Sequence, residues 1–170
     1  RHAAFHDALT ELPNRRYLIE HAGLSLADAK RRKESMALLL IDLDLFKPIN
    51  DQYGHDAGDQ MLCAIAQRLQ LHVRCNDMPA RLGGDEFAVL VSGPDAHLHA
   101  QEIAKRLLHE LEQPVLYNGA PLQVSVSIGA ALYPLHGEDF SSLNKAADQA
   151  LYQVKSAGRN GFALCGAIDE

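Results

Sequence analysis

Four acidic side chains stand at two places in the sequence where a ligand could reach them. Asp42 and Asp44 follow a continuous apolar run of the chain, and Asp85 and Glu86 follow two adjacent glycines. Residues i and i+2 of a strand point to the same side, so Asp42 and Asp44 would share one face. Mg²⁺ binds carboxylate oxygens together with water and substrate phosphates. If the two segments meet in space, the sequence predicts a magnesium site.

The glycine pair Gly83–Gly84 is predicted to form the tip of a tight β-hairpin. Glycine inside a helix or strand costs backbone entropy and packs no side chain, so two adjacent glycines favour a turn. The segments on either side, 79–82 and 87–91, are predicted to be its strands. A bulky ligand could lie directly on a glycine backbone. The alternative is an ordinary hairpin tip exposed to solvent.

Basic side chains that could bind phosphate groups occur near both segments. Lys47 lies shortly after Asp44, and Lys155 and Arg159 stand at the end of a predicted helix. Basic residues at a helix C-terminus also interact favourably with the helix dipole, which is the alternative explanation of Lys155 and Arg159. The chain has no G-x-x-x-x-G-K-[ST] motif, which disfavours a P-loop site. The residues alone therefore predict metal-dependent phosphate or nucleotide chemistry.

The composition is typical of a globular protein, and we expect one domain over residues 1–170. The chain is 47% hydrophobic and 22% charged, and its net charge of −6 disfavours nucleic acid as a partner. No apolar run approaches about 18 residues and no signal peptide is present, so we expect no insertion into a membrane. Three cysteines without C-x-x-C spacing indicate a cytoplasmic protein. Because the chain begins with Arg1, we expect it to be part of a longer protein.

The hydrophobic pattern predicts an α/β fold, a mixed sheet with helices laid over it. Asn14 marks the start of the first long helix, Asp56 is expected to cap the next, and Ser141 or Ser142 the last. Segment 42–59 is expected to be irregular, with Asp59 in the first turn of the helix that follows. The strand 122–128 is expected to bury one face only. The elements expected are helices around 15–33, 61–73, 103–111 and 143–154, strands at 36–41, 79–82, 87–91, 115–117, 122–128 and 162–164.

Four sequence blocks, in order, resemble one known family over nearly the whole chain. They are Asp7–Arg15, Ile41–Asp59, the hairpin segment Arg81–Phe87 and Ala147–Asn160. The chain resembles a GGDEF domain, the diguanylate cyclase family. The family's usual first block, D-x-L-T-G-L-P-N-R, has glycine where this chain has Glu11. Four blocks at the family spacing are more specific than the Gly-Gly-Asp-Glu-Phe motif alone.

The resemblance implies both a fold and a reaction. The fold would be the palm-like α/β fold of nucleotide cyclases, a mostly antiparallel central sheet flanked by helices, with the glycine hairpin at the active site. The reaction would be the condensation of two GTP molecules into cyclic di-GMP with release of two pyrophosphates. It would require Mg²⁺, or Mn²⁺ in its place. Each domain binds one GTP, so the active form would be a homodimer.

The resemblance also implies roles for individual residues. The metal would be held by Asp42, the carbonyl of Leu43, Asp85 and Glu86, with Glu86 also a candidate to accept the proton of the attacking 3′-hydroxyl. Asp85, Glu86 and Lys47 would form the catalytic group. The nucleotide would be bound by Phe46, Asn50, His55, Asp59, Gly83, Gly84, Lys155 and Arg159. An acid that stabilises the helix dipole is the alternative for Asp59.

Arg74 and Asp77 have the R-x-x-D spacing of the family's product-inhibition site. The resemblance implies that they bind cyclic di-GMP, whereas a surface salt bridge of little energetic value is the alternative. A second hypothesis for the whole chain is a non-catalytic module that binds GTP or cyclic di-GMP, attached to an EAL phosphodiesterase domain. The intact Asp85–Glu86 hairpin favours the cyclase. Sensor or EAL domains are expected in the parent protein.

Overall fold

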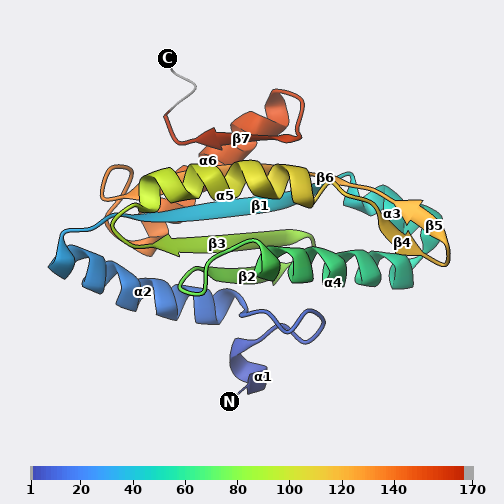
Figure 1. Cartoon of the computed structure of the whole chain (residues 1–170), viewed down its shortest axis with the longest axis horizontal. Coiled ribbons are helices and arrows are strands. Elements are labelled where there is room, and N and C mark those ends of the chain that lie inside the picture. The colour runs from blue at the N-terminus through green and yellow to red at the C-terminus, as the bar shows by residue number, and fades with distance from the viewer. Residues whose placement is uncertain (1, 167–170) are drawn as a thin grey trace.

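The computed structural model describes residues 2–166; residues 1 and 167–170 of the expected domain lie outside this range. Its centre is a five-stranded sheet in the order β2-β3-β1-β6-β7 (Figure 1). The pairs β2-β3, β3-β1 and β1-β6 are antiparallel, and only β6-β7 is parallel. The strands are β1 (Met36–Asp44), β2 (Met78–Gly83), β3 (Glu86–Ser92), β6 (Ser125–Tyr133) and β7 (Gly161–Leu164). The expected mixed, mostly antiparallel sheet is confirmed.

Helices cover both faces of this sheet. On one face, α2 (Arg15–Arg32) and α6 (Phe140–Ser156) pack against Leu38 and Leu40 of β1. On the other face, α3 (Phe46–Tyr53), α4 (His55–Leu71) and α5 (Ala96–Glu110) pack against Leu39 and Ile41. Successive residues of a strand point to opposite faces, so residues 36–41 of β1 must be apolar at every position, as their continuous apolar run predicted. This burial fixes β1 in the middle of the sheet.

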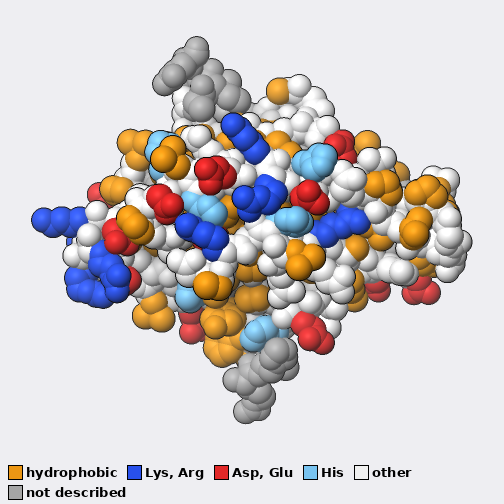
Figure 2. All heavy atoms as spheres, in the orientation of Figure 1, with side chains coloured by type: hydrophobic (Ala, Val, Ile, Leu, Met, Phe, Trp, Pro, Cys, Tyr) orange, Lys and Arg blue, Asp and Glu red, His pale blue; other side chains and the backbone are white. Residues whose placement is uncertain are grey.

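Two smaller elements lie outside the layers. The short helix α1 (His2–Phe5) precedes α2, and β4 (Val115–Tyr117) pairs with β5 (Ala120–Leu122) in a separate hairpin around the predicted Asn118–Gly119 turn. None of the helices in the described part of the chain is long and apolar enough to cross a membrane. On the face shown in Figure 2, Lys and Arg side chains are interspersed with Asp and Glu side chains over the middle of the molecule.

The predicted start of α2 is confirmed, whereas two predictions for the next helices were wrong. Oδ1 of Asn14 accepts a hydrogen bond from the Tyr17 backbone N–H at 3.0 Å. Segment 46–53 is helical rather than irregular, because Pro48 occupies the first turn, where its missing N–H has no intrahelical partner to lose. Helix α4 begins at His55 after Gly54, so Asp56 lies in the first turn instead of capping it. Asp59 consequently lies in the second turn of α4, whereas the prediction placed it in the first.

The last part of the chain also differs from prediction. Helix α6 begins earlier than expected, and Asp139 caps it by accepting from the Ser142 N–H at 2.9 Å. The predicted strand 122–128 is divided between β5 and β6, and the strand β6 is buried on both faces rather than one. Sequence alternation was misleading there because Ser127 is a buried polar residue, fully inside the structure.

Gly129 marks the closest approach of helix α6 to the sheet. A Cβ atom at this position of β6 would lie 2.3 Å from the Leu151 backbone nitrogen and 2.4 Å from the Ala147 carbonyl oxygen. Both contacts are with backbone, which cannot move without displacing α6. Only glycine therefore allows α6 to lie this close to β6.

We predict that Gly129→Ala lowers the free energy of unfolding by about 3 kcal/mol or more, because the helix must move away from the sheet. The matched control is Gly23→Ala in α2, where a Cβ would meet no atom within 4 Å. That substitution is expected to raise stability by about 0.5–1 kcal/mol, since it restricts the unfolded chain. Urea denaturation of both variants measures the difference, and equal stabilities would contradict the prediction.

Candidate active site

The acids that the sequence predicted to lie close together, Asp42 and the pair Asp85–Glu86, are brought together by the pairing of neighbouring strands. Strand β1 pairs with β3 so that Asp42 stands opposite Glu86. At the end of the pairing, the Leu43 backbone N–H donates to the carbonyl oxygen of Asp85 at 3.2 Å. The carboxylates of Asp42, Asp85 and Glu86 therefore gather at one end of the sheet. The proximity on which the predicted metal site depended is confirmed.

The charges at this end of the sheet are unbalanced toward negative. Burial raises the pKa of Asp85, and the nearby Asp42 raises it further. The pKa of Glu86 is raised by burial and then by Asp42 and Asp85. Cations counter them in part: the Lys155 ammonium forms an ion pair with Asp42, whose side chain is 10% exposed. Arg81 acts in the same direction on Asp85, and Arg15 on Glu86. Partly desolvated carboxylates that raise each other's pKa are groups that a divalent cation would stabilise.

These residues fit a magnesium ion as part of its coordination shell. Asp42, Asp85 and Glu86 offer carboxylate oxygens, and Leu43, which follows Asp42 in the chain, offers its backbone carbonyl. Within residues 2–166, no group of three or more His, Cys, Asp or Glu side chains is arranged to hold an ion by itself. Mg²⁺ commonly takes only one or two protein carboxylates and completes its shell with water and substrate phosphates. The donor set therefore suits a metal that arrives with a nucleotide.

A hollow of about 360 Å³ adjoins the acids and contains the predicted phosphate-binding cations. Its lining includes the two acids Asp42 and Asp85 and the three cations Lys47, Lys155 and Arg159. Lys47 is 84% exposed and is 3.7 Å from Asp51, so it can reach a ligand freely. The lining comprises Asp42, Leu43, Leu45, Phe46, Lys47, Pro48, Asp85, Lys155 and Arg159.

The predicted guanine-binding residues lie on the two helices that follow this hollow. Phe46 lines it, and Asn50 is one turn further along α3. A Cβ at Gly58 would be 1.8 Å from Oδ1 of Asn50, so glycine lets the Asn50 side chain press against α4. Asp59 is the next residue, and both it and His55 are exposed on α4. The structure thus brings Asn50 close to the backbone beside Asp59.

Asp44 is not available as a metal ligand, which corrects its inclusion among the candidate oxygen ligands. Its carboxylate accepts hydrogen bonds from the Ser125 and Ser127 hydroxyls at 2.6 and 2.7 Å. The backbone N–H of Asn160 donates a third, at 3.0 Å. The side chain is 2% exposed, so these donors enclose it.

The hairpin tip is held by two residues whose roles the sequence did not reveal. Gly83 and Gly84 have φ of 139° and 53°, which glycine adopts without strain. Nε and Nη2 of Arg81 donate to the Gly84 carbonyl at 3.2 and 2.7 Å, and its Nη1 forms a 3.0 Å ion pair with Asp7. Asp7 and Arg81 both belong to sequence blocks noted above, but 74 residues separate them. Only the fold shows that the first block clamps the tip.

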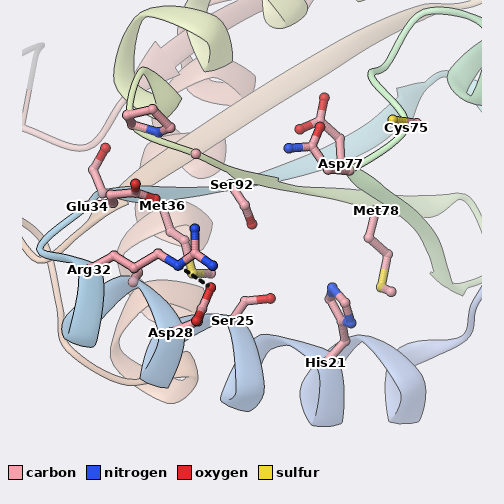
Figure 3. Close-up of a pocket in the computed structure, with 15 residues that line it drawn as sticks. His21, Ser25, Asp28, Arg32, Glu34, Met36, Cys75, Asp77, Met78 and Ser92 are labelled. Carbon is pink, nitrogen blue, oxygen red and sulfur yellow. Dashed lines mark ion pairs between the residues drawn. The ribbon is translucent and has the colours of Figure 1, made fainter.

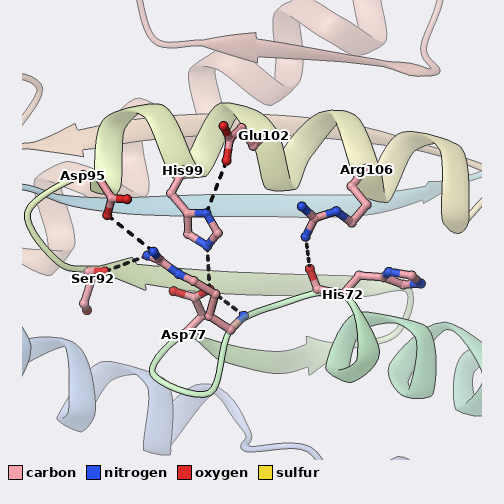
Figure 4. Close-up of polar contacts among 8 residues, drawn as sticks. His72, Asp77, Ser92, Asp95, His99, Glu102 and Arg106 are labelled. Atoms are coloured by element: carbon pink, nitrogen blue, oxygen red, sulfur yellow. Dashed lines mark hydrogen bonds and ion pairs between the residues drawn. The ribbon is translucent and has the colours of Figure 1, made fainter.

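Arg74 and Asp77 form a cluster around a buried carboxylate, with Arg74 half-buried, rather than a fully exposed salt bridge. The Asp77 side chain is 0% exposed; its Oδ2 accepts from the Arg74 backbone N–H at 2.8 Å and lies 3.1 Å from Nε2 of His99 on α5 (Figure 4). The Arg74 guanidinium donates to the Ser92 carbonyl at 3.1 Å and lies 3.4 Å from Asp95. Oδ1 of Asp77 and Nε of Arg74 are buried without a hydrogen-bond partner in the described residues. No pattern in the sequence predicted the role of His99.

Another hollow of about 510 Å³ lies between α2 and the first residues of β1 and β2 (Figure 3). Asp77 borders it, and Asp28 and Arg32 on α2 form an ion pair at 3.3 Å within it. None of its lining residues belongs to the hairpin tip or to the cation-lined hollow. It is therefore separate from the acidic site.

Known proteins with similar sequences belong to the family that the sequence blocks resemble. A family model described as diguanylate cyclase, GGDEF domain, matches residues 4–161. Diguanylate cyclase TpbB of Pseudomonas aeruginosa is 42% identical over 164 residues, which are 96% of this chain and 38% of that protein. MucR of the same organism, named a bifunctional diguanylate cyclase/cyclic di-GMP phosphodiesterase, is 41% identical over 161 residues, which are 95% of this chain and 23% of MucR.

Solved structures of GGDEF domains are similar to this chain over nearly its whole length. The GGDEF domain of TpbB matches with a TM-score of 0.92 at 41% identity, covering 96% of both chains. The GGDEF domain of DgcB from Caulobacter crescentus, solved with cyclic di-GMP, matches with a TM-score of 0.89 at 27% identity, covering 98% of this chain and 99% of that one. The chain therefore belongs to the GGDEF domain family, the diguanylate cyclases, as the sequence blocks indicated. It spans well under half the length of the two curated relatives named above.

The raised pKa values predict how stability depends on pH. The folded state binds the Asp85 and Glu86 protons more tightly than the unfolded state does. The stability that this contributes is present below the ordinary carboxyl pKa, near 4, and is lost as pH rises through the raised values. At neutral pH the charged Asp85 therefore destabilises the fold.

We predict that Asp85→Asn unfolds at a higher temperature than the unchanged chain at pH 7.5, and that the difference shrinks toward pH 4. Added Mg²⁺ should raise the unfolding temperature of the unchanged chain more than that of the variant. Asp51→Asn, at an exposed ion pair, is the matched control and should change little at either pH. Thermal melting followed by circular dichroism tests this, and a destabilised Asp85→Asn would contradict it.

Proposed function

We propose that this chain is a diguanylate cyclase domain that condenses two GTP molecules into cyclic di-GMP and releases two pyrophosphates. The observation that carries the proposal is the pairing of β1 with β3, which brings Asp42 together with Asp85 and Glu86 beside a cation-lined hollow. The family match supports the same conclusion. A hollow lined by both carboxylates and cations suits a metal–triphosphate complex.

The proposed metal is Mg²⁺, with Mn²⁺ as a substitute. Asp42, Asp85 and the Leu43 carbonyl would hold it, and Glu86 would add a ligand or accept the proton of the attacking hydroxyl. A bound divalent ion would lower the pKa of that hydroxyl and neutralise charge at the α-phosphate. The raised pKa of Glu86 supports its role as a proton acceptor, because a more basic carboxylate accepts a proton more readily.

The substrate's two ends would be bound by different elements. Lys47, Lys155 and Arg159 would bind the β- and γ-phosphates in the hollow that they line. The Lys155 ammonium now pairs with Asp42, and it would turn toward phosphate once a metal neutralises that carboxylate. At the other end, the Asp59 carboxylate would accept from guanine N–H groups, and the Asn50 amide would serve the remaining edge atoms. Phe46 and His55 would line the same pocket, and Gly83–Gly84 would let the nucleotide lie on the hairpin.

The product requires two such sites. One site binds one GTP, and each new phosphodiester bond joins the 3′-hydroxyl of one nucleotide to the α-phosphate of the other. Two copies of the chain must therefore face each other with their hairpins opposed. We propose a homodimer as the catalytic form.

A non-catalytic regulatory module attached to an EAL domain is the second candidate. Some relatives carry phosphodiesterase names, including MucR and NbdA of Pseudomonas aeruginosa. The intact Asp85–Glu86 pair opposite Asp42 favours the cyclase, because a module that only binds nucleotide does not need these acids for chemistry. Sensor or EAL domains in the parent protein and a cytoplasmic location are further parts of the proposal.

We predict that the purified chain, at a concentration that favours dimers, converts GTP and Mg²⁺ into cyclic di-GMP. Glu86→Gln should lower the rate by about a hundredfold or more, because it removes a proton acceptor and a negative charge. Glu138→Gln, on an exposed loop, is the matched control and should keep full activity. Chromatographic detection of product tests this; GTP binding without turnover in the unchanged chain would instead support the regulatory module.

We also propose that Arg74 and Asp77 bind the product and inhibit the enzyme. Arg74 would contact guanine and phosphate, and Asp77 would accept hydrogen bonds from guanine. Because the Asp77 carboxylate is enclosed by Arg74 and His99, the cluster must open to admit cyclic di-GMP. The two buried atoms without hydrogen-bond partners, Oδ1 of Asp77 and Nε of Arg74, are groups that a ligand could satisfy after this opening. Nε of Arg74 now lies 3.6 Å from Oδ2 of Asp77.

We predict that Arg74→Ala loses detectable cyclic di-GMP binding in calorimetry while it retains the cyclase rate. Arg16→Ala, which removes an exposed arginine paired with Glu20 on α2, is the control and should bind product like the unchanged chain. Product binding that survives Arg74→Ala would remove the cluster from the inhibitory site.

A further inference from the structure

The buried carboxylate of Asp44 connects three separate parts of the chain. Asp44 ends β1, and its hydrogen bonds with Ser125 and Ser127 tie it to β6. Its third hydrogen bond is to the backbone N–H of Asn160, in the turn between α6 and β7. Nη1 of Arg159, in the same turn, is 3.9 Å from Oδ1. The two serines of β6 hold the Asp44 carboxylate in place, and the carboxylate holds the loop at Asn160.

This turn has a conformation that requires such support. Gly158, Arg159 and Asn160 have consecutive φ values of 119°, 67° and 49°. A left-handed backbone costs most residues other than glycine about 1–2 kcal/mol, although asparagine tolerates it, so Arg159 is the residue that does not adopt it by preference. The Arg159 N–H donates to the Val154 carbonyl at 2.9 Å, which closes the C-terminal end of α6. The bond from Asn160 to Asp44 ties the turn to the end of β1, whereas the next residue, Gly161, begins β7 and pairs with β6. The Asn160 side-chain amide also donates to Glu112 at 3.4 Å.

The turn carries Arg159 to the cation-lined hollow. Arg159 is 47% exposed and lines that hollow together with Lys155 and Asp42. Asp42 and Asp44 lie two residues apart on one face of β1, so a single strand sets the positions of both. Asp42 faces the metal side of the hollow, and Asp44 holds the turn that supplies the phosphate side.

We propose that Asp44 is a positioning residue for Arg159, which it holds at the triphosphate end of the site without touching metal or substrate. The inference rests on the proposed function for the identity of the ligand, GTP, but not for the anchoring itself. An anionic carboxylate is required, because it accepts three hydrogen bonds and also faces the Arg159 guanidinium. An asparagine would present an amide N–H₂ group to one of those donors and would loosen the turn.

The test compares the unchanged chain with Asp44→Asn, Arg159→Ala and the double variant. Two probes are titrated by calorimetry: inorganic tripolyphosphate, which needs neither guanine recognition nor catalysis, and 3′-deoxy-GTP with Mg²⁺, which cannot react. Asp44→Asn should weaken both by about tenfold, the size expected when a supporting partner of a binding side chain is lost. In the Arg159→Ala background, the same substitution should cause less than about a twofold further loss, because the two changes act through one interaction.

Two further readouts distinguish positioning from other roles. The Mg²⁺ concentration for half-maximal 3′-deoxy-GTP binding should be unchanged in Asp44→Asn and raised in Asp42→Asn, the metal-side comparison. Thermal melting reports whether Asp44→Asn folds; if it does not, Ser125→Ala, which removes one hydrogen bond to the carboxylate, gives the same comparison with a smaller loss.

The outcomes separate this inference from the proposed function. Losses that multiply in the double variant, or a raised Mg²⁺ requirement in Asp44→Asn, would overturn the positioning role. Binding of tripolyphosphate but not of 3′-deoxy-GTP by the unchanged chain would overturn the cyclase proposal and leave the anchor standing. Binding of neither would overturn both.

Discussion

The antiparallel pairing of β1 with β3 is the constraint on which the rest of the structure depends. It places a strand that is buried on both faces beside the hairpin that ends in Gly83–Gly84. The register puts Asp42 opposite Glu86; a slip of one residue would exchange the side chains that pack on α2 and α6 with those that pack on α3, α4 and α5, so the fit of both layers fixes it. Hydrophobic packing along the whole strand therefore determines where three carboxylates meet at its end.

Gathering these carboxylates works against folding stability. Asp42, Asp85 and Glu86 lie close enough for the pKa values of Asp85 and Glu86 to be raised, and the Lys155 ammonium neutralises only part of the charge. A site that held no cation and no triphosphate would gain nothing from this arrangement. Local electrostatic strain of this kind is characteristic of functional sites, where a bound ligand compensates for it.

Polar contacts between distant segments complete the site. Arg81 joins Asp7 to the Gly84 carbonyl and so clamps the hairpin tip against the first sequence block. Asp44 joins β1 and β6 to the turn that carries Arg159. In both cases a buried or half-buried ion supports a glycine-containing turn. The sheet fixes the positions of the three acids, and these contacts fix the hairpin tip and the turn that carries Arg159.

The sequence by itself determined the family, the mixed sheet and the acids at its end, because continuous apolar runs, a glycine pair and motif spacing are local signals. It misjudged α3, the cap of α6 and the two-sided burial of β6, where packing overrides local preference. Asp42 and Asp44 look equivalent in sequence; only the tertiary structure decided that one faces the site and the other is enclosed by Ser125, Ser127 and Asn160. Likewise His99 and Asp7 gained partners, Asp77 and Arg81, from remote segments, and contacts between segments far apart in the chain leave no local pattern to read.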